Sequence, residues 1–179
     1  MSEYPPGSEE DRKTLAEMRM EKLLDYFFLQ IRNIWRVDGL YFLGIEKKFG
    51  TEAATEIDAG VWETMAAIEA KSLQRVFKIG ENPDVSVIIG LLRKSSWALD
   101  QPFKTTEIGN KRATLGVDRC RTQEARQGKG LREFPCKKVR FGYLKNFAKT
   151  LNPKVEVNCL VCPPDNHPQH LWCKWEFTL

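Results

Sequence analysis

Cys136 stands between a proline and a run of helical periodicity, a position that favours thiol chemistry. The stretch EFPCKKV places the thiol directly after Pro135, and the apolar residues that follow recur at helical spacing. A helix N-terminus carries partial positive charge and unpaired N–H groups that stabilise a thiolate, and Lys137 and Lys138 add cations. We therefore predict that Cys136 is a nucleophile, with the helix N–H groups stabilising the negative charge that develops. The alternative is a cysteine that only packs against the core.

A second group of candidate ligands lies around a proline-rich connection near the C-terminus. In the stretch CLVCPPDNHPQHLWC the candidates are Cys159, Cys162, His167, His170 and Cys173. Zinc takes four N or S ligands in a tetrahedron, so we expect zinc if this set holds a metal. The spacing differs from the usual finger pattern, and strand alternation predicts that Cys159 and Cys173 share a core layer while Cys162 points elsewhere. In the alternative, the cysteines are small buried residues and the histidines are polar loop groups.

The stretch DRCRTQEAR could bind an anionic substrate. It gathers Cys120, Arg121, Gln123 and Arg126 where a predicted strand gives way to a turn. Arginine offers a planar fork to a carboxylate, and glutamine offers both a donor and an acceptor. The group could therefore orient a small amino-acid-like anion. The alternative is a pair of arginines on the protein surface.

Two carboxylates of the predicted first helix could move protons. Asp38 and Glu46 are eight residues apart, which leaves them roughly 80° apart around a helix axis and able to face one cleft. Burial among Trp35, Phe42 and Phe49 would raise their pKa values and suit them to general acid or base catalysis. The alternative is that both lie exposed on the rim of the apolar stripe.

The elements that must position these residues begin with two long helices. Ser8 is predicted to cap an amphipathic helix that reaches Gly50, and Thr51 to cap a second helix that ends near Gly80. The stripe of the second helix expected to face the core consists of Ala54, Ile57, Val61, Met65 and Ile68.

The pattern after these helices predicts a sheet and one more helix. The later elements are expected to be a buried helix over 84–96 begun by Asn82 and Pro83, a hairpin over 103–120, a helix from about Cys136 to Leu151, and strands over 154–162 and 171–179. Helices first and strands afterwards predict an α+β fold, with an N-terminal helical half packed on a C-terminal antiparallel sheet. We expect a single domain over residues 1–179, with residues 1–10 flexible.

Composition narrows the classes of protein. The chain has 179 residues, of which 42% are hydrophobic, enough for one substantial core. No apolar run approaches the roughly 18 residues that a membrane helix needs, and the N-terminus has no secretory pattern, so we expect a cytoplasmic protein without a membrane partner. Five cysteines cannot all pair, which favours reduced thiols. The sequence leaves the oligomeric state open, a homodimer included.

Positive charge is concentrated in one region. Residues 104–154 hold 14 Lys or Arg against four acidic residues, a net charge of +10 within a chain whose net charge is +4. Such a region attracts anions. The aromatic residues in it are few, and signatures of nucleic-acid-binding folds are missing, so a nucleic acid is an unlikely partner. We expect a small anionic ligand or substrate.

The C-terminal motifs resemble a known group of proteins. The stretches CRTQEAR, EFPCKKVRFGYLKNFAKTL and VNCLVCPPDNHPQHLWCKWEF, with WRVDGLYFLGIEKKFG in the helical half, are similar to a family of prokaryotic cytosolic proteins related to L-2-amino-thiazoline-4-carboxylate hydrolases. This resemblance implies hydrolysis of a small carboxylated thiazoline. Cys136 would then attack the ring carbon, Arg121 or Arg126 would bind the carboxylate, and Asp38 or Glu46 would move protons.

The ending CKWEF also resembles vinyl-reductase-type small-molecule-binding domains. That second resemblance implies an α+β ligand or metal sensor without catalytic activity. A haem ligand is doubtful, because His167 and His170 fall in a predicted proline-rich hairpin rather than on a pocket helix.

Overall fold

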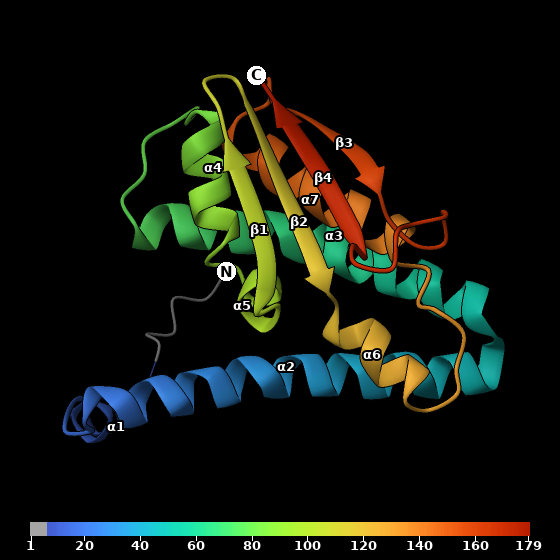
Figure 1. The fold of residues 1–179 in the computed structure, drawn as a ribbon. Coiled ribbons are helices and arrows are strands. Elements are labelled where there is room, and N and C mark those ends of the chain that lie inside the picture. The colour runs from blue at the N-terminus through green and yellow to red at the C-terminus, as the bar shows by residue number, and fades with distance from the viewer. Residues whose placement is uncertain (1–6) are drawn as a thin grey trace.

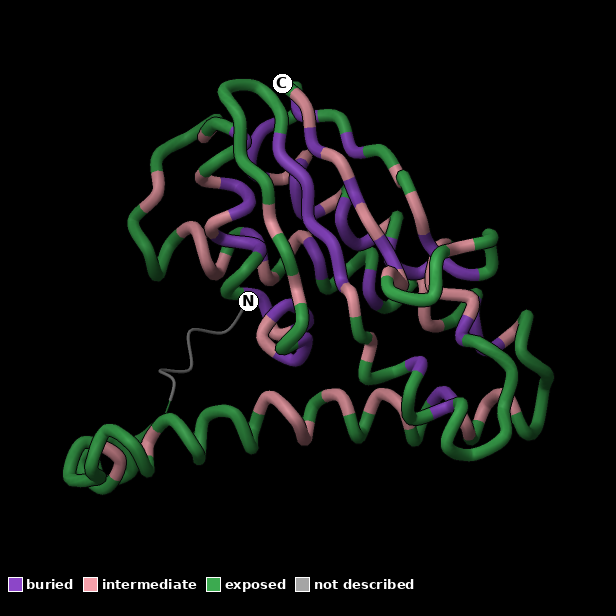
Figure 2. The backbone as a smooth tube through the Cα atoms, viewed as in Figure 1, coloured by how far each residue is buried: buried purple, intermediate pink, exposed green. Residues whose placement is uncertain are grey.

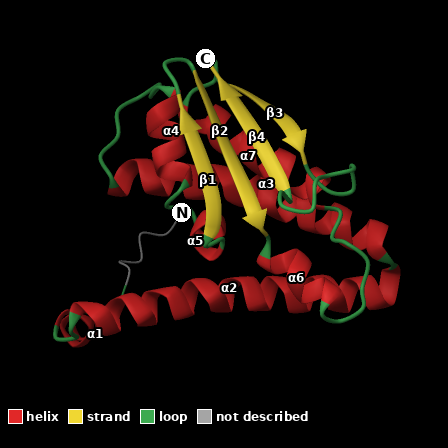
Figure 3. Cartoon of the chain, viewed as in Figure 1, coloured by secondary structure: helices red, strands yellow, loops and turns green. Residues whose placement is uncertain are grey.

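The fold is α+β, as the order of the predicted elements indicated. A computed structural model describes residues 7–179 (Figures 1 and 3). The helices are α1 (Glu9–Ala16), α2 (Met20–Phe49), α3 (Thr51–Val76), α4 (Val85–Leu92), α5 (Ser96–Asp100), α6 (Arg121–Gln127) and α7 (Cys136–Leu151). The strands are β1 (Phe103–Ile108), β2 (Arg112–Arg119), β3 (Glu156–Val161) and β4 (Cys173–Thr178). None of the helices described for residues 7–179 combines the length and the apolar character that spanning a bilayer requires.

The four strands form one antiparallel sheet in the order β1-β2-β4-β3. The alternation predicted for the last strand is confirmed, because Cys173, Trp175 and Phe177 are all buried. Helices α3, α4 and α7 lie on one side of the sheet (Figure 1), with α4 in contact with β2 and α7 in contact with β3. In β3 the register shifts between Cys159 and Val161, which alters the facing of the residues that follow.

Helices α3 and α7 make the most extensive helix–helix contact in the described chain. The face that α3 buries differs from the predicted stripe, which is wrong for four of its five positions. The buried residues are Ala54, Thr55, Trp62, Ala66 and Ala70, while Ile57, Val61, Met65 and Ile68 are exposed. Alanine keeps the contact surface thin and lets helix axes approach closely, so the small side chains, rather than the large apolar ones, face the core.

The predicted first helix is interrupted near its start, and the two halves of α2 differ in exposure to solvent. The predicted single helix from Ser8 to Gly50 is in fact two helices, since the backbone leaves helical geometry at Arg19. Ser8 caps α1 as predicted, through a hydrogen bond from the Asp11 N–H, and Gly50 ends α2 with a φ of 87°. The first half of α2 is almost entirely exposed (Figure 2), including Phe27 at 44%. Only the second half reaches the body of the protein.

Other predicted boundaries need correction. The second helix ends at Val76 rather than near Gly80, and the cap of α4 is Asp84, which accepts a hydrogen bond from the Val87 N–H at 2.9 Å. Asn82 has a φ of 49°, which is incompatible with an N-cap role. The helix predicted over 84–96 ends at Leu92, and Ser95 caps a separate helix, α5, that begins at Ser96.

Two further predictions concern the segments beside the strands and at the N-terminus. The predicted turn after β2 is the helix α6. The first six residues of the segment predicted to be flexible, 1–10, lie outside the described residues, while α1 begins at Glu9.

Candidate functional site

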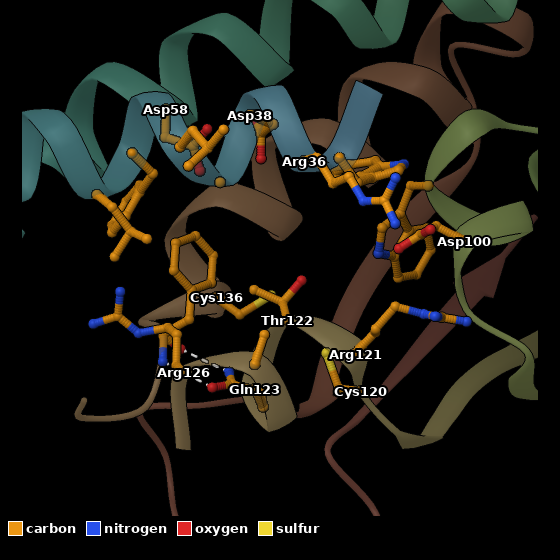
Figure 4. A pocket seen from close by; sticks show the side chains of 18 of the residues that line it. Arg36, Asp38, Asp58, Asp100, Cys120, Arg121, Thr122, Gln123, Arg126 and Cys136 are labelled. Carbon is orange, nitrogen blue, oxygen red and sulfur yellow. Dashed lines mark hydrogen bonds between the residues drawn. The ribbon is translucent and has the colours of Figure 1, made fainter. Parts of the chain in front are cut away.

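A cavity of about 380 Å³ lies where α2, α3, α5, α6 and the start of α7 meet (Figure 4). Its apolar walls are formed mainly by Trp35, Phe42, Trp62, Trp97 and Phe134. Most of the sequence-predicted catalytic and substrate-binding residues line it: Cys136, Asp38, Cys120, Arg121, Gln123 and Arg126. Flat aromatic walls with a few polar groups are typical of small-molecule sites.

The thiol of Cys136 faces this cavity from the first residue of α7. Side-chain hydrogen bonds join it to Cys162 and to Arg140, one helical turn further along. The hydrogen bond from Cys162, together with the guanidinium charge of Arg140, lowers the pKa of Cys136 below that of an ordinary thiol despite its burial. The same contact raises the pKa of Cys162, which therefore keeps its proton and donates it. The arrangement favours a thiolate on Cys136.

The cations that stabilise this thiolate are not those expected from the sequence. Lys137 pairs with Asp165 at 2.6 Å and Lys138 with Glu56 at 2.9 Å, so neither is aimed at Cys136. Arg140 provides the nearby positive charge instead.

The first N–H groups of α7 are also engaged, contrary to expectation. The Cys136 N–H donates to the Phe134 carbonyl at 2.7 Å, and the Lys137 N–H donates to the Pro163 carbonyl at 2.8 Å. These two groups are therefore not free to stabilise an oxyanion.

Arg140 is buried in a cage of aromatic rings. Its side chain is only 4% exposed, and its guanidinium carbon lies 4.5 Å from the ring centroid of Trp97 and 5.0 Å from that of Tyr143, with Trp35 and Trp62 slightly further away. Cation–π attraction offsets part of the cost of burying this charge. Among the described residues, the Nε and Nη1 atoms have no hydrogen-bond partner. Arg140 was not among the residues predicted from the sequence, although it follows Cys136 at the helical spacing of four.

Asp38 and Asp58 form a pair of carboxyl groups on the wall opposite the thiol. The Trp62 Nε1–H donates to Asp38 at 2.9 Å, and a side-chain hydrogen bond joins the two carboxyls. Burial raises the pKa of Asp38. Burial and the negative charge of Asp38 raise the pKa of Asp58 to about 7. The pair therefore exchanges a proton near neutral pH, as a general acid or base must.

The signal for Asp58 in the sequence was its spacing of four from Trp62. It was obscured because the predicted core stripe of α3 placed Ile57 and Val61, rather than Trp62, toward the core.

Glu46 and Arg126 neutralise one another and are unsuited to the roles predicted for them. Two hydrogen bonds of 2.9 Å join the Arg126 guanidinium to the Glu46 carboxylate, and the remaining Nε–H of Arg126 donates to the Arg132 carbonyl. The hydrogen bonds from Arg126, with that from Thr51, hold the pKa of Glu46 below its usual range. Glu46 is thus a poor proton donor, and the Nε, Nη1 and Nη2 atoms of Arg126 all donate to groups of the protein itself.

Two other predicted substrate-binding residues have structural roles. The side-chain amide of Gln123 donates to the Phe134 carbonyl at 2.9 Å and accepts from the Phe134 N–H at 2.8 Å, so it fixes the backbone just before Cys136. Burial raises the pKa of Cys120 to about 12, which keeps this thiol protonated.

Arginines gather at another side of the cavity, beside Asp100 (Figure 4). Arg32 binds the buried Asp100 through two hydrogen-bonded contacts of 3.0 and 2.9 Å. Arg121 lies close enough to influence the pKa of both. Arg36 donates to Asn33 at 3.1 Å. Within residues 7–179 neither Arg36 nor Arg121 forms an ion pair, so this side of the cavity has two positive charges in excess.

The predicted metal ligands do not converge. Cys162 is buried between Cys136 and Cys173, because the register shift in β3 turns it inward rather than away as predicted. The His167 ring packs at a tilt against Trp172, with centroids 4.6 Å apart, and faces Glu133, while His170 is exposed. Across residues 7–179, no group of three or more His, Cys, Asp or Glu side chains is arranged to hold a metal ion.

Cys159 remains apart from the buried sulfurs. It is partly exposed in β3, and burial raises the pKa of its thiol to about 11. A thiol with such a pKa stays protonated at neutral pH.

Comparison with known proteins identifies the family of this chain but no individual relative among curated proteins. A search among curated proteins found no match. A family model with the description "Family of unknown function (DUF6125)" matches residues 16–179, which include the whole cavity described above and every strand. The chain therefore belongs to this family of unknown function, DUF6125.

Proposed function

We propose that the protein is a cytoplasmic, thiol-dependent hydrolase of a small carboxylated thiazoline-like or related C–N compound. The observation that carries this proposal is the placement of the Cys136 thiol on an aromatic cavity, beside Arg140 and within electrostatic reach of Asp58. The class of reaction comes from the resemblance of the motifs around Cys136 to thiazoline carboxylate hydrolases.

The charges around Cys136, Arg140 and Asp58 suit the first half of such a reaction. The Cys136 thiolate would add to the carbon of the C=N bond, and the electron pair of that bond would move to nitrogen, which takes a proton from Asp58. The nitrogen lone pair would then re-form the C=N bond and expel the ring sulfur. With the first N–H groups of α7 engaged, Arg140 is the group that stabilises negative charge on the attacking sulfur.

Water would complete the second half. Its oxygen would bond to the same carbon while the electron pair of the re-formed C=N bond returns to nitrogen and the Asp58 carboxylate takes one of the water protons. The C–S bond to Cys136 would break, with its electron pair returning to sulfur, and the remaining hydroxyl proton would pass to the expelled ring sulfur. The sum is one water consumed and a ring-opened amide and thiol formed, with Asp58 and Cys136 restored.

A second candidate is a binding domain that performs no reaction. It is favoured by one observation, the engagement of the Cys136 and Lys137 N–H groups with backbone carbonyls, which removes these two donors from the stabilisation of an oxyanion. In that case the cavity would hold its ligand by aromatic stacking and ionic contacts alone. Zinc is not part of either candidate function, because the predicted ligands do not form a set around one point.

Hydrolysis of 2-aminothiazoline-4-carboxylate, followed by mass spectrometry of the product, tests the first candidate. We expect Cys136→Ala and Asp58→Asn to lower kcat by at least about 100-fold, the usual effect of removing a nucleophile or a proton-transfer group. Cys120→Ala is the matched control, because this thiol also lines the cavity but is protonated. Normal turnover by Cys136→Ala would exclude the mechanism. Saturable binding without turnover by the unaltered protein would favour the binding domain.

A further inference from the structure

We infer that the arginines beside Asp100 form the carboxylate-recognition site of the cavity, so that the ligand lies with its anionic group toward Arg36 and Arg121 and its reacting carbon toward Cys136. This inference rests on the proposed function and specifies its substrate class: a flat ring compound whose carboxylate lies across the ring from the electrophilic carbon.

The charged groups of the cavity fall into two separate sets. The inner set consists of Asp38, Asp58, Cys136 and Arg140, and the outer set of Arg32, Arg36, Asp100 and Arg121. The pKa of Asp58 responds to Asp38, Arg140 and Cys136. The pKa of Asp100 responds to Arg32 and Arg121, and that of Arg32 to Asp100, Arg121 and Arg36. Figure 4 shows Asp38 and Asp58 together on one side and Arg36, Asp100 and Arg121 on another.

The two sets differ in charge, because only the outer set has positive charges in excess. At the inner set, the positive charge of Arg140 is already balanced by the Cys136 thiolate, and the carboxyl pair adds further negative charge, so a ligand carboxylate would be repelled there. At the outer set, Asp100 accepts two hydrogen-bonded contacts from Arg32, which leaves Arg36 and Arg121 without a carboxylate among the described residues. An anion is therefore attracted to the outer set.

The outer set is held in place by the end of α5 and the start of α6. Asp100 is 4% exposed and is held at the end of α5, where it fixes Arg32 in place. Arg121 begins α6, and its backbone N–H donates to the side chain of Gln101, next to Asp100. Arg121 and Arg36, the latter with one nitrogen donating to Asn33, form no ion pair among the described residues and stand at the side of an aromatic cavity, where they offer the planar, charge-assisted hydrogen bonds that a carboxylate accepts.

The walls between the two sets add the requirement for a flat ring. Trp35 stacks on Trp62 with ring centroids 4.5 Å apart, and Trp97 lies over Arg140. A cavity of about 380 Å³ accommodates one ring with its substituents rather than a polymer or a cofactor.

Alkylation of Cys136 by a matched pair of reagents tests this orientation without any turnover. The probes are 4-(bromomethyl)benzoate and its neutral amide, 4-(bromomethyl)benzamide, and the reaction forms a C–S bond while bromide leaves. Rates are measured by mass spectrometry of the Cys136 peptide, and the ratio of the acid rate to the amide rate is divided by the same ratio for glutathione. We expect this normalised ratio to exceed one for the unaltered protein, and to fall about three- to tenfold in Arg36→Met and in Arg121→Met.

Matched variants keep the outcome unambiguous. Arg75→Met removes an exposed arginine of α3 that does not line the cavity, and it should leave the ratio unchanged. Both target arginines are exposed, so their loss should not unfold the protein, which a thermal melt checks. A ratio that stays the same in Arg36→Met, Arg121→Met and Arg75→Met would overturn the inference, even if Cys136 proves essential for hydrolysis. A ratio that falls only in the two cavity variants would support it, even if no hydrolysis is found.

Discussion

The two helices that pair with α3 make very different contacts. On one side α7 packs on a face of alanines, with Ala54, Ala66 and Ala70 fully buried, and this layer continues into the sheet. On the other side α2 is held at a few points by polar and aromatic contacts, such as the hydrogen bond from Trp62 to Asp38. The cavity lies on the side of α2. The comparison shows that the layer of α3, α7 and the sheet positions Cys136 and Arg140, while α2 contributes Asp38 and two arginines beside Asp100, Arg32 and Arg36.

Enlarging the alanine face should have the largest effect on stability. Ala66 is 0% exposed on the α3 face that packs on α7, so Ala66→Leu forces extra methyl and methylene groups into a contact with no room. We expect the free energy of unfolding to fall by about 3 kcal/mol, measured by urea denaturation. A change below about 0.5 kcal/mol would mean that the helices are not closely packed.

Asp58 should make stability depend on pH. Its pKa is about 7 in the folded protein against an ordinary value of 3.8, so the folded state holds the proton more tightly than the unfolded chain does. The contribution of this group to stability is therefore full below about pH 4 and is lost as the pH rises to about 7. Asp58→Asn should remove that loss and stabilise the protein by about 2 kcal/mol at pH 8, with little gain at pH 4. Equal effects at both pH values would contradict the raised pKa.

Breaking the ion pair between Glu46 of α2 and Arg126 of α6 should have a smaller effect on stability. Arg126→Met leaves the Glu46 carboxylate largely shielded from water without its bidentate partner, and we expect a loss of about 1–2 kcal/mol. Adding Glu46→Gln should recover part of the loss, because the unpaired charge is then removed. A double variant less stable than Arg126→Met alone would argue against an unpaired charge as the cause.

The exposed half of α2 should contribute least. Phe27 is 44% exposed and Phe28 is 47% exposed, so Phe27→Gln and Phe28→Gln should change the free energy of unfolding by no more than about 0.5 kcal/mol. A larger loss in dilute solution would show that this half of α2 is covered in the folded protein.

The sequence predicted best those elements whose periodicity reflects one packed face. The helix from Cys136 to Leu151 and the alternation of β4 follow this rule, and both are confirmed. Periodicity failed for α3, because hydrophobicity ranks isoleucine above alanine while close helix packing favours the smaller residue.

The candidate site could be predicted only in part. Cys136, Asp38 and Arg121 line the cavity as the sequence led us to expect. The ion pair between Arg126 and Glu46 joins residues 80 positions apart. No local sequence pattern indicated that these two side chains would bind one another rather than a substrate. Arg140 went unnoticed for a related reason, since an arginine within a basic helix is usually exposed, and only the three-dimensional cage of tryptophans distinguishes it.

Because α2 runs without interruption from Met20 to Phe49, it carries Arg32 and Arg36 of the outer set and Asp38 of the inner set on one helix. Arg32 and Asp38 are six positions apart, which at 1.5 Å per residue sets their backbones about 9 Å apart along the axis. A single inserted residue between them would lengthen this distance and rotate Asp38 by about 100°. The spacing between these two charged residues is therefore fixed by the uninterrupted helix itself, and an insertion within it would change both the distance and the direction between them.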